Sequence, residues 1–249
     1  MADELLAGKT AVVTGAGRNI GAGIARRFAD HGATVIVNDV DEQRATDVVD
    51  SLATQHDQDH RALVCDAIDP DAVEAAAETI DDEYDSLDIL VNNLGYAVNK
   101  GVFDTSVEEW HQVVDLTLTS GFLWTKHAGE LLVDSGGGSI INLASRLASV
   151  GSSEKIAYCA AKGGVLNMTN QLAIDLADDD VRVNAISPGN VGDPVGQTSG
   201  RQGGFDTSSI PLDRIGDPAD VADAAVFLAS DMADYISGAN LPVDGGKSA

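Results

Sequence analysis

The sequence predicts an α/β fold, with one doubly wound parallel sheet covered by helices on both faces. Short apolar, β-branched runs alternate with longer stretches of helical spacing along the whole chain. This alternation is typical of right-handed βαβ units, whose ligands bind at the carboxyl ends of the strands. Because no Pro- or Gly-rich linker divides the 249 residues, residues 1–249 are expected to form one domain.

Six strands are expected where β-branched and aliphatic residues form short runs bounded by Gly, Asp or Asn. These runs are Thr10–Thr14, Thr34–Asn38, Ala62–Cys65, Ile89–Val91, Ser139–Leu143 and Val181–Ile186. Six helices are expected as well, several of them opened by an N-cap candidate, namely Asp41, Asp69, Ser106 or Asp217. The helices are Ile20–Asp30, Glu42–Gln55, Pro70–Asp82, Val107–Leu132, Ala157–Leu176 and Pro218–Ala229.

Residues 189–213 fit neither pattern. This stretch is rich in Gly, Ser, Gln and Thr and follows a strand, at the place where a doubly wound sheet binds its ligand. We therefore expect it to be a substrate-binding lid.

The chain is strongly acidic, with 40 Asp and Glu against 15 Lys and Arg and a net charge of −25. A surface of this charge repels phosphate backbones and anionic lipids, so neither nucleic acid nor a membrane is expected as a partner. Of the 40 acidic residues 31 are Asp, and they are spread along the chain. Short acidic side chains in this number indicate a halophilic protein whose surface stays hydrated in concentrated salt. An ordinary acidic protein is the alternative.

No apolar run approaches the ~20 residues of a membrane helix, and the first residues lack the basic start and apolar core of a signal peptide. A cytoplasmic location is therefore expected. Cys65 and Cys159 are the only cysteines, and neither lies in a Cys-x-x-Cys or Cys/His cluster. Reduced thiols and no metal site are expected.

The first expected strand runs into a glycine-rich turn, Thr14-Gly15-Ala16-Gly17-Arg18-Asn19-Ile20-Gly21, and then into a helix. A strand, a glycine turn and a helix N-terminus direct backbone N–H groups toward an anion, typically a pyrophosphate, although a simple tight turn also fits. Asp39 ends the second strand, where an acidic side chain accepts the hydroxyls of an adenosine ribose. Asp66 ends the third strand and could receive the adenine amino group. Either carboxylate could equally be a solvated strand end.

With these motifs the chain resembles the short-chain dehydrogenase/reductase family over nearly its whole length. Thr14–Gly21 resembles the family's glycine turn, Asn92-Asn93-Leu94-Gly95 resembles its Asn-Asn-Ala-Gly, and Ser145 with Tyr158-x-x-x-Lys162 resembles its Ser and Tyr-x-x-x-Lys. Three further phrases follow in family order, namely Ser187-Pro188-Gly189, Pro211–Pro218 and Val243-Asp244-Gly245-Gly246.

Within the family, the sequence most resembles the 3-oxoacyl-reductase-like enzymes and the sugar or polyol dehydrogenases. The resemblance implies a Rossmann-type sheet. It also implies hydride transfer between a nicotinamide cofactor and a secondary alcohol or ketone, which could be a sugar, polyol, hydroxy acid or cyclic alcohol. The family is usually tetrameric through its helices, so a homotetramer is expected.

The resemblance implies that Tyr158 is the general acid/base. A phenol with a pKa near 10 is a poor base at neutral pH, but the Lys162 ammonium lies four residues later on the expected helix, where it favours the phenolate and lowers the tyrosine pKa. Ser145 ends the fifth strand and would bond the substrate oxygen. Its neighbour Arg146 could meet an anionic or hydroxylated substrate, or have a structural role.

The resemblance also implies the cofactor site. Its residues are Gly15, Arg18, Asn19, Ile20, Gly21, Asp39, Asp66, Asn93, Gly95, Tyr158, Lys162, Pro188, Gly189 and Val191. NAD is expected rather than NADP, because the Asp39 carboxylate bonds a ribose diol and repels a 2′-phosphate. Arg18 argues against a preference for NAD, because a basic residue in the turn is one way to bind the 2′-phosphate of NADP. Asn92 and Asn93 also fit strand-end capping.

Four residues depart from the family pattern. Asn19 replaces the second glycine of the turn, which Asn tolerates because it adopts left-handed angles more readily than other side chains. Leu94 replaces a small Ala beside the cofactor, and Asp193 replaces a Thr that commonly meets the carboxamide. Thr117 stands where an Asn distorts a helix and its carbonyl holds a proton-relay water. We expect the Thr117 hydroxyl to bond a carbonyl one turn earlier and act as a substitute.

Two alternatives from other classes remain. A nucleotide-sensing protein would keep the fold and bind the cofactor without turnover, but Ser145, Tyr158 and Lys162 are all present. A lyase similar to a halohydrin dehalogenase would carry Arg in place of Lys162 and lack the glycine turn.

The acidic composition predicts that activity and stability rise with salt into the molar range. At ~1 M salt the Debye length is about 3 Å, so the repulsion among the 40 carboxylates is mostly screened. Melting temperature and initial rate measured from dilute buffer to molar potassium chloride test this. Full activity and an unchanged melting temperature in dilute buffer would contradict the halophilic interpretation.

Overall fold

In the computed structural model, which describes residues 4–192 and 207–249, seven parallel strands form one sheet in the order β3-β2-β1-β4-β5-β6-β7. The strands are β1 (Thr10–Val13), β2 (Thr34–Asp39), β3 (Arg61–Val64), β4 (Ile89–Asn92), β5 (Gly138–Leu143), β6 (Val181–Pro188) and β7 (Asn240–Val243). Because strand order reverses between β1 and β4, a ligand crevice is expected at their carboxyl ends in this doubly wound sheet.

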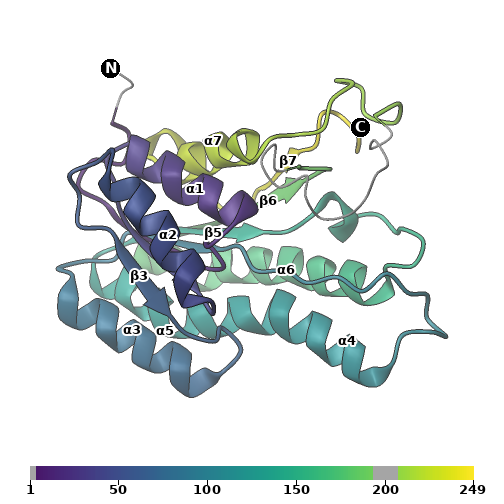
Figure 1. Cartoon of the computed structure of the whole chain (residues 1–249), viewed down its shortest axis with the longest axis horizontal. Coiled ribbons are helices and arrows are strands. Elements are labelled where there is room, and N and C mark those ends of the chain that lie inside the picture. The colour runs from purple at the N-terminus through teal and green to yellow at the C-terminus, as the bar shows by residue number, and fades with distance from the viewer. Residues whose placement is uncertain (1–3, 193–206) are drawn as a thin grey trace.

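Helices cover both faces of the sheet (Figure 1). On one face α1, α2 and α7 share an apolar core with β1, β2 and β4. The opposite face carries α3, α5, α6 and, packed on α6, α4. The bounds are α1 (Asn19–Asp30), α2 (Glu42–Ala53), α3 (Pro70–Glu83), α4 (Val107–Val114), α5 (Ser120–Asp134), α6 (Ile156–Asp175) and α7 (Pro218–Ala229).

The expected fold class is confirmed, and the six expected strands each lie within two residues of an observed one. The four N-cap candidates are confirmed too. The side chains of Asp41, Asp69, Ser106 and Asp217 accept backbone N–H groups at the starts of α2, α3, α4 and α7. These capping bonds satisfy amides that would otherwise lack partners at each helix start.

The structure differs from the expectation at two places. β7 was not expected, because its sequence Asn-Leu-Pro-Val lacks a β-branched run; it is an edge strand beside β6, where a proline is tolerated. The expected helix over residues 107–132 is interrupted. A π-helical turn, Asp115–Thr119, joins α4 to α5 and places Thr117 within it.

The expected lid is described only at its two ends. Residues 193–206, and with them Asp193, lie outside the described residues. On either side the chain is fixed to the fold, since Val191 forms a β-bridge with Gly216, and the Leu212 N–H donates to the Gly245 carbonyl at 3.1 Å. Arg214 adds a bidentate ion pair with Asp220, at 2.6 and 2.8 Å.

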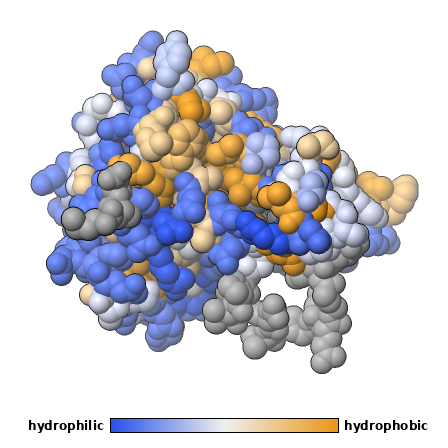
Figure 2. Space-filling view, turned by 90° about the horizontal axis from the view of Figure 1, so that it is seen from above, coloured by the Kyte–Doolittle hydropathy of each residue, from blue (hydrophilic) through white to orange (hydrophobic). Residues whose placement is uncertain are grey.

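The acidic residues lie almost entirely on the surface. Among the described carboxylates only Asp39 is buried. Seen from above, the surface is largely hydrophilic, and apolar residues gather towards the centre and right of the view (Figure 2). Within the described ranges, the helices are all too short or too polar to cross a bilayer.

Candidate active site

The glycine turn leaves the N-terminus of α1 open toward the crevice. Arg18 occupies the N-cap without a side-chain cap, and the first turn of α1 carries no acidic residue. In so acidic a chain this contrasts with α2, α3, α4 and α7, whose first turns hold Asp or Glu. The unbonded N–H groups and the helix dipole therefore suit a bound anion.

Backbone conformation explains the composition of this turn. Gly15 has φ +58°, and Asn19 has φ +51°, so Asn19 adopts the left-handed conformation expected of it. A Cβ atom on Gly17 would come 2.6 Å from Asp39 Oδ2, and one on Gly21 would come 2.6 Å from the Gly15 carbonyl. Side chains at these positions would fill the space between the turn and its neighbours.

Asp39 is held at the end of β2 by two backbone amides. Its Oδ2 accepts from Gly17 N–H and its Oδ1 from Asp41 N–H, both at 3.1 Å. The carboxylate therefore joins the glycine turn to the start of α2. Its burial and its place beside the turn match the expected ribose acceptor. Asp66 is exposed beyond β3, where its Oδ1 accepts from Ile68 N–H at 3.2 Å.

Asn93, directly after β4, stabilises the glycine turn through hydrogen bonds. Its Nδ2 donates to the carbonyls of Thr14 and Gly15 at 2.9 and 3.1 Å, and its N–H donates to the Thr14 hydroxyl at 3.0 Å. Strand-end capping is therefore one role of Asn93. Leu94 packs against the same turn, since a Cβ on Gly15 would lie 2.6 Å from its Cδ2.

The remaining expected cofactor residues lie at the same edge of the sheet. Gly95 is next to Lys162, whose Nζ would be 3.1 Å from a Cβ at that glycine. Pro188 ends β6, and Gly189 N–H donates to the Val243 carbonyl at 2.9 Å. A Cβ on Gly189 would be 2.7 Å from Asp244 Cα, so glycine is required there.

Lys162 is buried on α6, with 3 % of its surface exposed. Its Nζ donates to the carbonyls of Leu143, at the end of β5, and Leu94, just past the end of β4. Among the described residues no carboxylate pairs with it. Desolvation lowers its pKa to about 7.

Tyr158 lies one helical turn before Lys162, and its ring centroid is 6.0 Å from the lysine Nζ. The expectation that the pKa of Tyr158 is lowered was wrong for the protein without a bound cofactor. Burial raises the pKa of Tyr158, and a hydrogen bond with the Ser145 side chain offsets only part of that rise. Ser145 Oγ also accepts from Leu147 N–H at 3.1 Å, which fixes the serine at the end of β5.

Thr117 does not bond a carbonyl one turn earlier, as expected. Its hydroxyl oxygen accepts from Tyr96 N–H at 3.1 Å and lies 3.3 Å from the Tyr96 carbonyl, to which it donates. Ser120 instead makes the bond within the helix, donating to the Leu116 carbonyl at 3.0 Å. Thr117 thus connects the π-turn to the loop after β4.

Arg146 stands apart from the other partly buried arginines of the described chain. Arg27 pairs with Asp223 at 2.7 Å, and Arg182 donates to the Leu228 carbonyl at 2.8 Å. The side chain of Arg146 makes no hydrogen bond or ion pair with any other described residue. The half-buried Arg146, which follows Ser145 in the chain, is thus a candidate to bind an anion.

Two buried amides under the site were not identified from the sequence as a pair. Asn92 and Asn142 are register partners on β4 and β5, and Asn92 Nδ2 donates to Asn142 Oδ1 at 2.9 Å. Asn92 Nδ2 also donates to the Thr125 hydroxyl on α5, and Asn142 Nδ2 donates to the Thr169 hydroxyl on α6. The sequence feature that could have revealed this pair is Asn142, a polar residue within the apolar run of β5.

Comparisons with known proteins agree with this geometry. The sequence pattern of the family described as enoyl-(acyl carrier protein) reductase matches residues 15–248. The D-threitol dehydrogenase of Mycolicibacterium smegmatis is 39% identical over 98% of this chain and 94% of its own length. The cis-4-hydroxycyclohexanecarboxylate dehydrogenase of Sinomonas cyclohexanicum is 40% identical over 99% of both chains.

A solved short-chain type dehydrogenase/reductase from Mycobacterium marinum superposes with a TM-score of 0.89 and 30% identity, covering 98% of this chain and 97% of that one. Ordered motifs, sheet topology, the Ser145, Tyr158 and Lys162 geometry and these full-length matches agree. The chain belongs to the short-chain dehydrogenase/reductase family.

Proposed function

We propose that this protein is an NAD-dependent dehydrogenase/reductase that interconverts a secondary alcohol and its ketone. The observation that supports this best is the arrangement of Ser145, Tyr158 and Lys162 at the carboxyl ends of β4 and β5. A nicotinamide cofactor, when bound, supplies the hydride acceptor or donor. The chain supplies the proton chemistry at the substrate oxygen.

Tyr158 takes the proton of the substrate hydroxyl during oxidation and returns it during reduction. Because burial raises the pKa of the free Tyr158 and so disfavours its phenolate, formation of the phenolate that accepts this proton depends on positive charge nearby. Lys162, beside it on α6, supplies this charge in its protonated form. Ser145, bonded to the same phenol, orients the substrate oxygen.

The cofactor fits the residues around the glycine turn. The open N-terminus of α1 suits its pyrophosphate, and Asp39 is placed for the adenosine ribose. Lys162 would also bond the nicotinamide ribose, with Asn93, Gly95 and the chain around Gly189 lining the same side. NAD is favoured because the Asp39 carboxylate, buried and anionic, repels a 2′-phosphate.

The substrate class is best narrowed by Arg146. The Arg146 side chain follows Ser145 in the chain and has no partner among the described residues, which favours an anionic substrate that the net charge of −25 would otherwise repel. One relative is named for 4-hydroxycyclohexanecarboxylate, a ring alcohol bearing a carboxylate, and another for the neutral polyol D-threitol. We therefore place hydroxy acids first and polyols second.

Three further properties belong to the same proposal. Val107, Trp110 and Phe122 expose apolar surface along α4 and α5, which supports a homotetramer formed through helices. The carboxylate-rich surface supports function at high salt, and the composition supports a cytoplasmic location.

The proposed reaction predicts turnover of 4-hydroxycyclohexanecarboxylate with NAD in molar salt, followed by the absorbance of the reduced cofactor. Tyr158→Phe should abolish it. Arg146→Met should lower kcat/KM about tenfold for this acid, a loss of about 1.4 kcal/mol, because the charged hydrogen bond is removed. The matching carboxamide and the conservative variant Arg146→Lys serve as controls.

Equal losses for the acid and its amide would contradict a contact between Arg146 and the carboxylate. Tight cofactor binding with no turnover of any acid, polyol or cyclic alcohol would contradict the enzyme assignment and favour a nucleotide sensor.

The position of Asp39 predicts that kcat/KM is higher with NAD than with NADP. Asp39→Asn keeps an oxygen for the Gly17 N–H but removes the charge, so the preference for NAD should fall at least tenfold. Steady-state kinetics with both cofactors measure the ratio. Asp47→Asn, at an exposed carboxylate on α2, is the control. Equal efficiency of the wild type with NADP would refute the assignment.

The contacts of Thr117 predict a graded loss of activity. We propose that it replaces the family's Asn in the proton relay by holding the loop at Tyr96 against the π-turn. Thr117→Asn should leave kcat within about tenfold of the wild type. Thr117→Val should cost more, since the Tyr96 peptide then loses its partner. Thr119→Val, in the same π-turn, controls for loss of a hydroxyl. A Thr117→Val enzyme as active as the wild type would overturn this role.

A further inference from the structure

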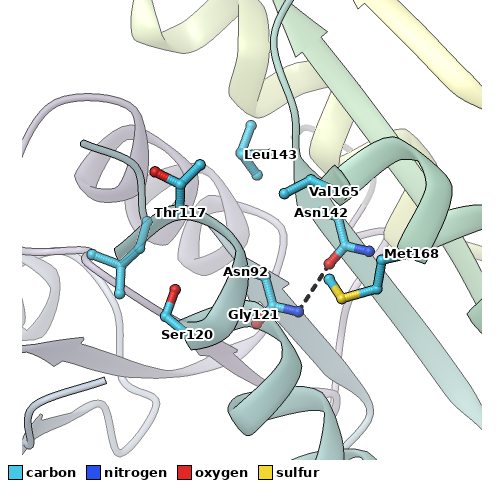
Figure 3. Close-up of a pocket in the computed structure, with 9 residues that line it drawn as sticks. Asn92, Thr117, Ser120, Gly121, Asn142, Leu143, Val165 and Met168 are labelled. Carbon is cyan, nitrogen blue, oxygen red and sulfur yellow. Dashed lines mark hydrogen bonds between the residues drawn. The ribbon is translucent and has the colours of Figure 1, made fainter. Parts of the chain in front are cut away.

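A small cavity lies between the π-turn and the ends of β4 and β5 (Figure 3). Measured as the space open to the centre of a water molecule, it has a volume of about 10 Å³. That is about the minimum that one buried water requires. Its lining comprises Asn92, Leu94, Thr117, Ser120, Gly121, Asn142, Leu143, Val165 and Met168.

One polar atom of this lining lacks a partner. Asn92 is buried, and its Oδ1 accepts no hydrogen bond from any described residue. The orientation of its amide is fixed by a directed chain of donors: Asn92 Nδ2 to Asn142 Oδ1, Asn142 Nδ2 to Thr169 Oγ1, and Thr169 Oγ1 to the Val165 carbonyl. Rotating the amide would set two acceptors against each other, so Oδ1 must find a donor elsewhere.

The other lining side chains offer no such donor. The hydroxyls of Thr117 and Ser120 already donate to the carbonyls of Tyr96 and Leu116, and the rest of the lining side chains, apart from the bonded Asn142, are apolar or absent. A water molecule can donate one O–H group to Asn92 Oδ1 and the other to the Ser120 hydroxyl oxygen. An unmatched buried acceptor destabilises the folded state, and such a water would offset that cost.

The same residues support the lysine. Leu94 and Leu143, whose carbonyls accept from Lys162 Nζ, line the cavity and follow Asn92 and Asn142 by two residues and one residue. We propose that the cavity holds one ordered water bound to Asn92 Oδ1, and that Asn92 is through it a positioning residue for Lys162. The water fills the gap between the π-turn and the strand ends, and so fixes the spacing of the two carbonyls.

Two glycines of α5 give a matched test. A Cβ on Gly121 would lie 3.5 Å from Met168 Cε and 3.7 Å from Asn92 Cβ, and one on Gly129 would lie 3.7 Å from Thr125 Cγ2. Both are ordinary contacts, and both glycines are buried in the same helix. Gly129→Ala should raise Tm by about 2–4 °C through helix propensity. Gly121→Ala should give no such rise, because its methyl takes the space of the water and leaves Asn92 without a donor.

A rise in Tm for Gly121→Ala equal to or above that of Gly129→Ala would overturn the water site, since a dry cavity gains from being filled. A crystal structure of the wild type at high resolution should show one density peak within hydrogen-bond distance of Asn92 Oδ1. A cavity without density there would also overturn the site.

The positioning role rests on the proposed function and has its own readout. The acidic limb of the kcat profile against pH should shift by at least half a unit in Gly121→Ala and stay unchanged in Gly129→Ala. An unchanged limb in Gly121→Ala overturns the positioning role. A wild type without turnover would instead count against the proposed function, while the melting and diffraction results would still decide the water.

Discussion

A buried ammonium needs oxygen acceptors, and Lys162 finds them only where two neighbouring strands end. The carbonyls of Leu94 and Leu143 belong to the chain segments just past β4 and at the end of β5, so the position of the lysine depends on how these strands are aligned. Around it, α6 places Tyr158 one turn away and β5 delivers Ser145 to the same edge. Sheet register and helix spacing together determine the relative positions of the three groups.

The position of the one buried carboxylate also depends on the sheet. The carboxylates that give this chain its acidity remain on the described surface, with the exception of Asp39. Burying one carboxylate is costly unless it is well bonded, and Asp39 accepts from two backbone amides. Since one of these amides belongs to the glycine turn, the proposed ribose acceptor and the proposed pyrophosphate cradle are held as a single unit.

Much of this organisation could be predicted from local sequence. The glycine turn, the end of β2 at Asp39 and the spacing of Tyr158 and Lys162 are all encoded within short segments, and the structure places them at one edge of the sheet. The left-handed conformation of Asn19 could also be predicted, because few other side chains tolerate it.

The remaining features depend on residues far apart in the chain. Asn92 meets Asn142 only because β4 pairs with β5 in one register, and Thr117 meets Tyr96 only because a loop passes that point of the π-turn. The pKa of Tyr158 follows from burial, which no local pattern reports. β7 was not predicted, because an edge strand that contains a proline shows almost no hydrophobic periodicity.

The fixed ends of the segment after β6 have a consequence for how such a protein changes over generations. The bridge from Val191 to Gly216 and the ion pair from Arg214 to Asp220 hold the chain on both sides, independently of the sequence between Gly192 and Thr207. We therefore expect insertions and exchanges there to leave the sheet intact. Because this is the stretch that the sequence predicts to bind substrate, substrate choice would change there separately from the proposed proton chemistry, and loops exchanged between relatives are a starting point for engineering it.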